Sequence, residues 1–169
     1  QTKKHMKTLI PVFMMQKKVQ IISDGSLDLS QELTKEKDIE VVPFYVFFDS
    51  ETYQKEMVEV GVREFYQEMV DHPTVFPKTS MPSVHDYYEV FEKHAKEQLP
   101  VICICITRKF SGSLQSATTA KDMILEEYPD AQITVIDSTV NTVLQGLYVL
   151  EACRLRDMGL EYQQIVDAL

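Results

Sequence analysis

The fold is decided by residues 101–137, which read VICICITRKFSGSLQSATTAKDMILEEYPDAQITVID. The stretch opens with a nearly continuous apolar run at 101–107, passes through a hydroxyl-rich loop into a helical pattern at 113–128, and ends in a second apolar run at 133–137. Continuous apolar runs of this length are typical of strands buried on both faces. Strand, helix and strand in this order predict a right-handed crossover between parallel strands.

The same alternation extends through the rest of the chain. Two more β-rich runs lie at 19–23 and 41–48. Helical patterns occupy residues 30–37, 62–70, 84–98 and 142–158. The sequence therefore predicts an α/β fold, a mostly parallel sheet sandwiched by helices, with no linker that would divide these residues into two domains.

The helix expected at 84–98 has the clearest local signals. One side of it carries the apolar positions Val84, Tyr87, Tyr88, Phe91 and Ala95. Pro82 precedes it, and the pair Ser83 and Asp86 has the spacing of a capping box. We expect the aromatic residues of this helix to lie in the core.

Composition excludes several classes of protein. The chain has 169 residues, of which 44% are apolar, with five glycines and seven prolines, so neither disorder nor a fibrous repeat fits. Acidic residues outnumber basic ones by 26 to 17, and no acid lies in residues 1–18, which hold five of the lysines. The remaining acidic body would repel nucleic-acid phosphates and anionic lipid headgroups, so neither is an expected partner.

The two ends of the chain carry their own signals. We interpret residues 1–18 as a leader or an added N-terminal segment, because their apolar run is short, contains Pro11 and is followed by no signal-peptidase site. No apolar run approaches the roughly 18 residues of a membrane-spanning helix, so a cytoplasmic location is predicted. A helical pattern at 160–169 stops without a helix-ending signal, which indicates that the chain is cut short.

Hydroxyl-rich loops follow three of the expected strands. They read S-D-G-S at 23–26, T-R-K-F-S-G-S at 107–113 and D-S-T at 137–139, and a further cluster, K-T-S-M-P-S, lies at 78–83. In open α/β sheets, ligands bind beyond the carboxyl ends of the strands, where loops run into helix N-termini. Hydroxyls and free backbone N–H groups gathered at that edge would form an anion site.

For any one loop, a purely structural role is the commoner one. Asp24 and Asp137 are suited to capping the turns that they begin. The repetition of such loops at one edge favours a binding site over turn chemistry alone. No P-loop and no G-x-G-x-x-G pattern occurs, which argues against nucleotide binding.

Other kinds of chemistry have little support in the sequence. There is no G-x-S-x-G elbow, so the serines are expected to act as hydrogen-bond donors rather than nucleophiles. The cysteines, Cys103, Cys105 and Cys153, lie in apolar runs and are expected to be buried structural thiols. The four histidines show no ligand spacing, so we predict no metal and no cofactor.

Five motifs in a fixed order point to a family. They are S-D-G-S at 23–26, V-V-P at 41–43, K-T-S-M-P-S at 78–83, F-S-G-S-L-Q-S-A at 110–117 and V-I-D-S at 135–138. In this order the chain resembles the DegV family of bacterial fatty-acid-binding proteins. K-T-S-x-P-S combined with S-G-[ST]-x-Q-S-A at this separation is the specific part. The resemblance covers nearly all of residues 19–169.

The resemblance implies a two-domain protein that encloses one long-chain fatty acid and presents it to a separate, ATP-using fatty acid kinase for acyl-phosphate formation in phospholipid synthesis. The binder itself is not an enzyme. On this reading residues 19–158 are the N-terminal α/β domain, and residues 159–169 begin a truncated C-terminal domain or a connecting helix. An isolated domain would expose the face on which the second domain docks, so oligomerisation is expected.

Carried over to this chain, the resemblance assigns the fatty-acid carboxylate to the hydroxyls of Thr79 and Ser111. Supporting candidates are Ser80, Gly112 and Ser113, and further ones at neighbouring strand ends are Asp24, Ser26 and Ser138. The family's first loop usually reads D-S-[TA], where this chain has glycine at position 25. The alternative hypothesis is a phosphotransfer or small-molecule kinase domain that binds a phosphorylated metabolite, because parallel α/β domains with hydroxyl-rich strand ends also hold phosphates.

Overall fold

Four parallel strands form the central sheet, in the spatial order β2-β1-β6-β7. The strands are β1 (Gln20–Asp24), β2 (Ile39–Val42), β6 (Val101–Cys105) and β7 (Ile133–Asp137). The structure is a computed structural model and describes residues 19–48 and 52–169, so the prediction for residues 1–18 lies outside it. Every residue of β1 and of β6 is buried, as their nearly continuous apolar runs predicted. The same prediction is wrong for β7, where only Ile133 is buried, because β7 lies at the edge of the sheet.

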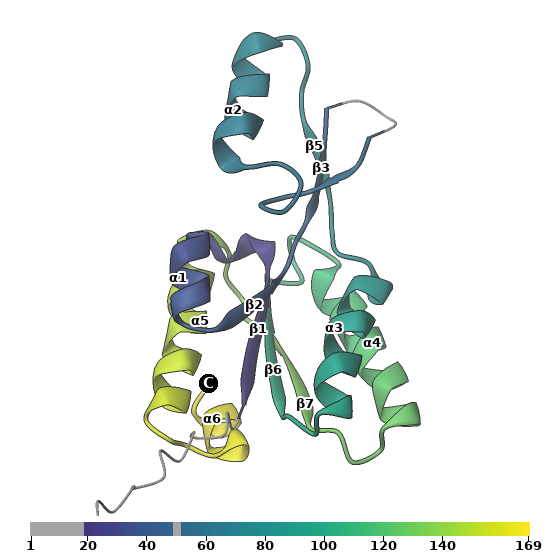
Figure 1. The fold of residues 1–169 in the computed structure, drawn as a ribbon, viewed down its shortest axis with the longest axis vertical. Helices are drawn as coiled ribbons and strands as arrows, with labels where there is room; N and C mark the ends of the chain where they lie inside the picture. The colour runs from purple at the N-terminus through teal and green to yellow at the C-terminus, as the bar shows by residue number, and fades with distance from the viewer. Residues whose placement is uncertain (1–18, 49–51) are drawn as a thin grey trace, which may run out of the picture.

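Helices cover both faces of this sheet (Figure 1). On one face lie α3 (Val84–Lys96) and α4 (Ser113–Glu127), and on the other lie α1 (Gln31–Glu36), α5 (Thr142–Asp157) and α6 (Tyr162–Ala168). A short 3-10 turn follows β1. The predicted α/β fold, a parallel sheet sandwiched by helices, is confirmed.

The core is divided into two clusters by the sheet. Alternate residues of β6 face opposite sides: Cys103 and Cys105 pack with α3 and α4, whereas Ile102 and Ile104 pack with α5. All three cysteines are buried and free, as predicted, with Cys153 in the α5 cluster. The cysteines therefore belong to the packing of the core.

Helix α3 begins where its capping signal predicted. The Ser83 side chain accepts a hydrogen bond from the Asp86 backbone, and the Asp86 carboxylate accepts one from the Ser83 backbone. Tyr87 and Phe91 are fully buried, and their rings contact each other at 5.8 Å between centroids. The predicted apolar face of this helix is confirmed.

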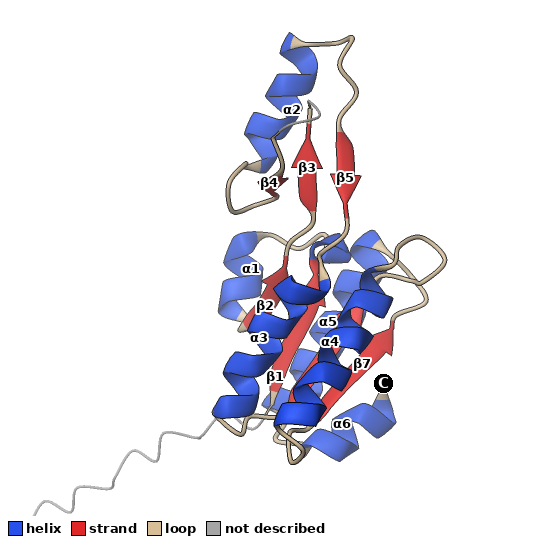
Figure 2. Ribbon diagram, turned by 90° about the vertical axis from the view of Figure 1, so that its right-hand side faces the viewer, coloured by secondary structure: helices blue, strands red, loops and turns tan. Residues whose placement is uncertain are grey.

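The chain after β2 leaves the sheet and builds a smaller unit, here called the arm. It consists of β3 (Tyr45–Phe47), β4 (Gln54–Lys55), α2 (Val62–Asp71) and β5 (Lys78–Ser80). The strands form a three-stranded antiparallel sheet in the order β4-β3-β5. Figure 2 shows the arm projecting beyond one end of the body, where it is joined by the chain entering β3 and the chain leaving β5.

Two sequence predictions in this region are wrong. The single strand expected at 41–48 is two strands in different sheets, because Pro43 has no N–H for a ladder and the next amide, that of Phe44, donates to the Glu56 side chain. Lys78–Ser80, expected as a loop, is strand β5 and pairs with β3. Neither pairing has a local signal, since both depend on residues far away in the sequence.

Helix α6 packs against the body through Ile165, which is fully buried in the same cluster as α5. The boundary that we predict at residues 158/159 stays a prediction. Over the part of the chain that the structure describes, no helix combines the length and the apolar character needed to cross a membrane.

Candidate functional site

The carboxyl end of β1 is anchored by a buried network around Asp24, which is completely inaccessible to solvent. Its Oδ2 accepts hydrogen bonds from the Ile106 backbone (2.9 Å) and the Ser113 hydroxyl (2.8 Å). Its Oδ1 accepts from Gln145 Nε2 (2.8 Å) and from the Ser26 backbone (3.2 Å). Burial raises the pKa of Asp24, although each of these hydrogen bonds acts in the opposite direction.

Ser113 is occupied by this network. Besides its bond to Asp24, its hydroxyl lies 2.6 Å from the Tyr87 hydroxyl, and it has no exposed surface. Ser113 therefore connects α3, α4 and β1 inside the body. Its hydroxyl is therefore used inside the protein, beneath the surface on which Ser111 lies.

Ser111 lies at the surface end of the same loop and is half-buried. Its oxygen accepts a hydrogen bond from the Ser113 backbone (3.1 Å), which leaves its own proton for another acceptor. Gly112 is the N-cap of α4 and has no side chain to cap the helix, while Ser111 takes up the N–H of Ser113, the first residue of α4. The next N–H groups of α4, those of Leu114 and Gln115, have no acceptor within the helix, so they and the positive end of the helix dipole favour an anion.

Thr79 and Ser80 lie on β5 of the arm and are both exposed. Thr79 pairs with Val46, and Ser80 pairs with Tyr45. Directly after β5, the Met81 side chain covers Gly112: a Cβ added to that glycine would lie 2.7 Å from Met81 Sδ. The structure thus brings the K-T-S-M-P-S segment against the S-G-S segment, two motifs about thirty residues apart.

Thr79 also opens onto a cavity of about 690 Å³ between the arm and the start of α1. The apolar part of its lining includes Val46, Val60, Phe65 and Tyr66. Ser111 is not among the residues that line this cavity. The lining also includes polar and acidic residues, among them Asp28, Glu32 and Glu56. The hydroxyl of Thr79 therefore lies at one side of a hollow with a mixed apolar and polar lining, whose size is typical of ligand pockets.

Glu56, at the end of β4, is a site residue that sequence reasoning missed. It lines the same cavity, accepts a hydrogen bond from the Phe44 backbone (3.1 Å), and lies directly over Gly25, where any Cβ would overlap its Oε1. Burial raises the pKa of Glu56, and the nearby charge of Asp24 adds to the effect. The one available signal was the glycine at position 25, which leaves room for this carboxyl group.

The remaining sequence candidates are engaged within the protein. Ser138 donates to the Val140 carbonyl (3.0 Å), accepts from the same residue's N–H (3.3 Å), and is almost fully buried. The Ser26 hydroxyl accepts a long bond, 3.5 Å, from the Thr142 backbone. Asp137, expected to cap its turn, accepts from the Thr139 backbone (2.9 Å).

The arm is tethered to the body by Asp86, near the start of α3. Its carboxylate accepts hydrogen bonds from the Tyr45 hydroxyl (2.8 Å) and the Ser83 hydroxyl (2.6 Å), and lies 3.2 Å from Lys55 Nζ. Burial would raise the pKa of Asp86, but the bonds from Ser83, Tyr45 and Lys55 outweigh it and lower that pKa. Asp86 therefore helps to set where β5 and Thr79 lie.

Comparison with known proteins places these features in a wider group. A family model described as the DegV family matches residues 18–169. A DegV domain-containing protein of Clostridium acetobutylicum is 34% identical over 152 residues, which is 90% of this chain and 52% of that protein. The chain thus spans about half the length of the curated relatives that it matches.

Solved structures agree with this result. A stearic-acid-binding protein of Eubacterium ventriosum superposes with a TM-score of 0.84 at 46% identity, covering 88% of this chain and 51% of that one. A DegV family protein of Thermus thermophilus, described as binding fatty acid, gives a TM-score of 0.74 at 30% identity, covering 89% and 51%. Each similarity covers nearly nine tenths of this chain.

Proposed function

This chain belongs to the DegV family, and from that membership and the site geometry we propose that it binds a long-chain fatty acid, whose carboxylate is held by the hydroxyls of Thr79 and Ser111. DegV family proteins bind fatty acids in solved structures. The observation that carries the proposal for this chain is the contact between the two motifs, where Met81 lies on Gly112 and joins the strand of Thr79 to the loop of Ser111.

The cavity beside Thr79 supports an apolar ligand with one polar end. Its apolar residues would bury the methylene groups of the ligand, each of which contributes roughly 0.8 kcal/mol when it leaves water. The exposed hydroxyl of Thr79 is left at the edge of this surface for a carboxylate.

In this proposal the fatty-acid carboxylate is bound by neutral hydrogen-bond donors and not by a lysine or arginine side chain. Ser111 offers a hydroxyl proton, and the start of α4 offers the backbone N–H groups of Leu114 and Gln115 and the positive end of the helix dipole. Hydrogen bonds to a charged acceptor contribute about 1.5–3 kcal/mol each.

We further propose that the bound carboxylate is presented to a separate fatty acid kinase, so that the binder supplies no catalytic group. Presentation requires the carboxylate to be reached from outside. Thr79, Ser80 and Gly112 are exposed, which suits such access.

The binding proposal is tested by two variants, Thr79→Val and Ser111→Ala, in protein that is purified and then extracted for mass spectrometry of carried lipid. Each change removes one donor without emptying the core, so we expect about tenfold weaker stearate binding and an unchanged unfolding curve. Thr74→Val, an exposed threonine away from the cavity lining, serves as the control. Unchanged stearate affinity in both site variants, or a carried phosphorylated metabolite in place of a fatty acid, would contradict the proposal.

The kinase proposal is tested separately, by incubating the loaded protein with ATP alone and with ATP plus a fatty acid kinase. Acyl-phosphate should form only with the kinase. Formation with ATP alone would show that the chain is itself a catalyst.

A further inference from the structure

The acyl chain of the proposed fatty acid would enter a cavity that is not uniformly apolar. Three acidic side chains line the cavity beside Thr79, and they are those of Asp28, Glu32 and Glu56. Asp28 and Glu32 are exposed and keep their contact with water, whereas Glu56 is half-buried. A carboxyl group that is partly withdrawn from water is costly to cover with methylene groups alone. Glu56 is therefore the lining residue that a plain fatty acid does not explain.

The carboxyl group of Glu56 is held in place through one of its oxygens. Its Oε1 accepts a hydrogen bond from the Phe44 backbone (3.1 Å), while the backbone N–H of Glu56 donates to the Phe44 carbonyl (3.0 Å). The same oxygen lies directly over Gly25, where any added Cβ would overlap it. Within residues 19–48 and 52–169, no hydrogen bond reaches the other oxygen, Oε2. The side chain thus offers one open acceptor at a defined place.

Glu56 also lies between two cavities. Next to the cavity of about 690 Å³ lies a smaller one of about 180 Å³, and Gly25, Glu56 and Met57 are among the residues that line both. The rest of the smaller cavity is mostly apolar, with Leu27, Leu29, Ile39, Val41 and Pro43 in its lining. An acyl chain that starts at Thr79 and continues into this apolar end therefore passes the carboxyl group of Glu56.

The strand pairing of the arm sets the distance between Thr79 and Glu56. Thr79 pairs with Val46, and Glu56 bonds to Phe44, two residues before Val46. Thr79, Val46 and Glu56 all line the larger cavity, so they project from the same face of the arm. With about 4.8 Å between strands and about 3.3 Å per residue, the backbones of Thr79 and Glu56 are about 12 Å apart. An extended carbon chain with bonds of about 1.5 Å covers that distance in about ten carbons.

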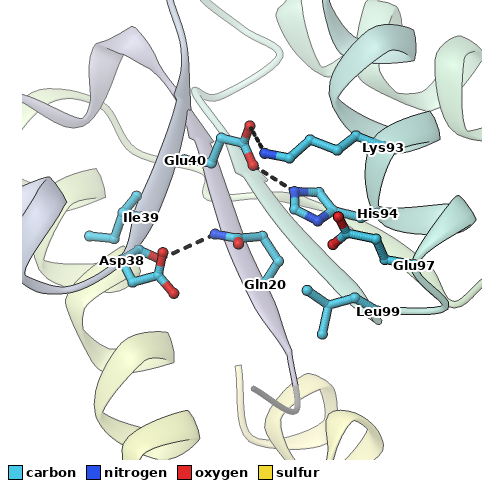
Figure 3. Close-up of a pocket in the computed structure, with 8 residues that line it drawn as sticks. All are labelled: Gln20, Asp38, Ile39, Glu40, Lys93, His94, Glu97 and Leu99. Carbon is cyan, nitrogen blue, oxygen red and sulfur yellow. Dashed lines mark hydrogen bonds and ion pairs between the residues drawn. The ribbon is translucent and has the colours of Figure 1, made fainter. Parts of the chain in front are cut away.

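The hollow at the other end of the sheet, where β1 and β2 begin, is no alternative for an acyl chain. It has a volume of about 560 Å³, and most of its lining is polar or charged (Figure 3). Lys93 and His94 both point toward the carboxylate of Glu40 and are paired with it. The apolar side chains in this lining are those of Ile39 and Leu99. The apolar surface that a long chain needs lies instead beside Thr79 and Glu56.

We propose that this chain prefers a fatty acid with a hydroxyl group near the middle of its acyl chain, and that Oε2 of Glu56 binds this hydroxyl. The preference rests on the proposed function, since the carboxylate of the ligand is taken to lie at Thr79. A hydroxyl group can donate to an ionised carboxylate, and it can both donate to and accept from a neutral carboxyl group, so the pairing holds in either state of Glu56. It also gives this carboxyl group a partner when the acyl chain displaces water from it.

The test is a competition between two isomers, 10-hydroxystearate and 2-hydroxystearate, with stearate present as the reference. Lipid-free protein is incubated with equal amounts of the three, separated from unbound lipid and extracted for mass spectrometry. We expect about threefold to tenfold more bound 10-hydroxystearate than 2-hydroxystearate, the gain from one hydrogen bond. Because the isomers have the same composition, their ratio reports the position of the hydroxyl group.

Two variants test whether Glu56 binds the hydroxyl. In Gly25→Ala the new Cβ displaces the Glu56 carboxyl group, and in Glu56→Met the carboxyl group is removed while a long side chain remains. Both variants should bind the two isomers in nearly equal amounts, and either one suffices if the other does not fold. The matched controls are Gly61→Ala, where an added Cβ meets nothing within 4 Å, and Glu64→Met, at an exposed position outside the lining. Both controls should keep the wild-type ratio.

Three results would overturn the proposed preference. If stearate is bound and the two hydroxystearates are bound equally, the fatty-acid site stands and only the role of Glu56 fails. If none of the three ligands is bound, the proposed function fails as well. If Gly25→Ala and Glu56→Met both keep the preference for 10-hydroxystearate, another residue binds the hydroxyl group.

Discussion

The body and the arm are held together by different means. In the body, every residue of β1 and β6 is buried, and helices cover the sheet on both sides. In the arm, α2 has no buried residue, and the few buried side chains include Val46 and Val60. The body is therefore stabilised by its core, while the arm depends on a few specific contacts with the body.

This difference matters for the proposed site, because its two hydroxyls come from the two regions. Ser111 sits on the body, in front of a buried hydrogen-bond network, and Thr79 sits on the arm. The contacts of Asp86 and Glu56 tie the two regions together. Changes to those contacts should disturb ligand binding more than global stability, and changes to the buried network should do the reverse.

The largest expected effect is that of Asp24→Ala in the body. The change leaves the Ile106 amide, the Ser113 hydroxyl and the Gln145 amide without their acceptor inside the core. We expect a loss of about 3 kcal/mol in the free energy of unfolding, measured by urea denaturation. Asp122→Asn, at an exposed position on α4, is the control. A loss no larger than that of the control would show that the network is not what stabilises the body.

Asp86→Ala should lower the free energy of unfolding less than Asp24→Ala does. It should loosen the arm more. The Tyr45 hydroxyl and the Lys55 ammonium lose their partner, and α3 loses half of its capping box. We expect about 1–2 kcal/mol of destabilisation and faster hydrogen exchange of β3 and β5 amides. Exchange in β1 and β6 should change much less. Equal acceleration in both sheets would mean that the arm and the body open as one unit.

The contact of Gly25 with Glu56 can be tested by a double-mutant cycle. Gly25→Ala alone forces the Glu56 carboxyl away from its place and should cost about 1 kcal/mol. In a Glu56→Ala background the same change should cost less, because the Glu56 carboxyl atoms are gone and the Phe44 backbone nitrogen, at 3.3 Å, is the nearest atom left. Additive costs would indicate that this contact does not couple the arm to the body.

The smallest expected effect is a change in how the free energy of unfolding depends on pH, and it comes from Glu56. The pKa of Glu56 is raised in the folded protein, so its contribution to stability is present below the unfolded pKa of about 4.3 and is lost as pH rises through the folded value. Glu56→Gln removes this dependence while keeping an acceptor for Phe44. Relative to wild type, the variant should therefore gain stability as pH rises above the unfolded pKa of about 4.3. Because the group is partly exposed, we expect the gain to be below about 1 kcal/mol.

The control for the Glu56→Gln variant is Glu64→Gln, at an exposed position in the first turn of α2.

Asp86 should change stability with pH in the opposite direction to Glu56. Its pKa is lowered, so its contribution to stability is present above the unfolded pKa of about 3.9 and is lost as pH falls through the folded value. A Glu56→Gln variant that loses stability relative to wild type as pH rises would contradict the assignment.

Much of the body could be predicted from the sequence, because its signals are local. Continuous apolar runs predicted β1, β6 and β7, and Ser83 with Asp86 predicted the start of α3. In the arm, the helix expected at 62–70 is confirmed as α2 (Val62–Asp71), but the strands were predicted poorly, because they are short and pair with residues of other segments. Lys78–Ser80 has no strand pattern of its own and becomes a strand only beside β3.

For the candidate site, the residues alone were enough to predict the family, the motifs and the end of the sheet at which they gather, since parallel strands bring their carboxyl ends together. Which polar groups are used inside the protein depends on the three-dimensional fold. Ser113 turns inward because Asp24, 89 residues earlier, needs its proton in a buried place, and Glu56 joins the site because Gly25 leaves it space. Such contacts form between segments far apart in the chain, and a buried polar group takes whichever partner the fold brings to it.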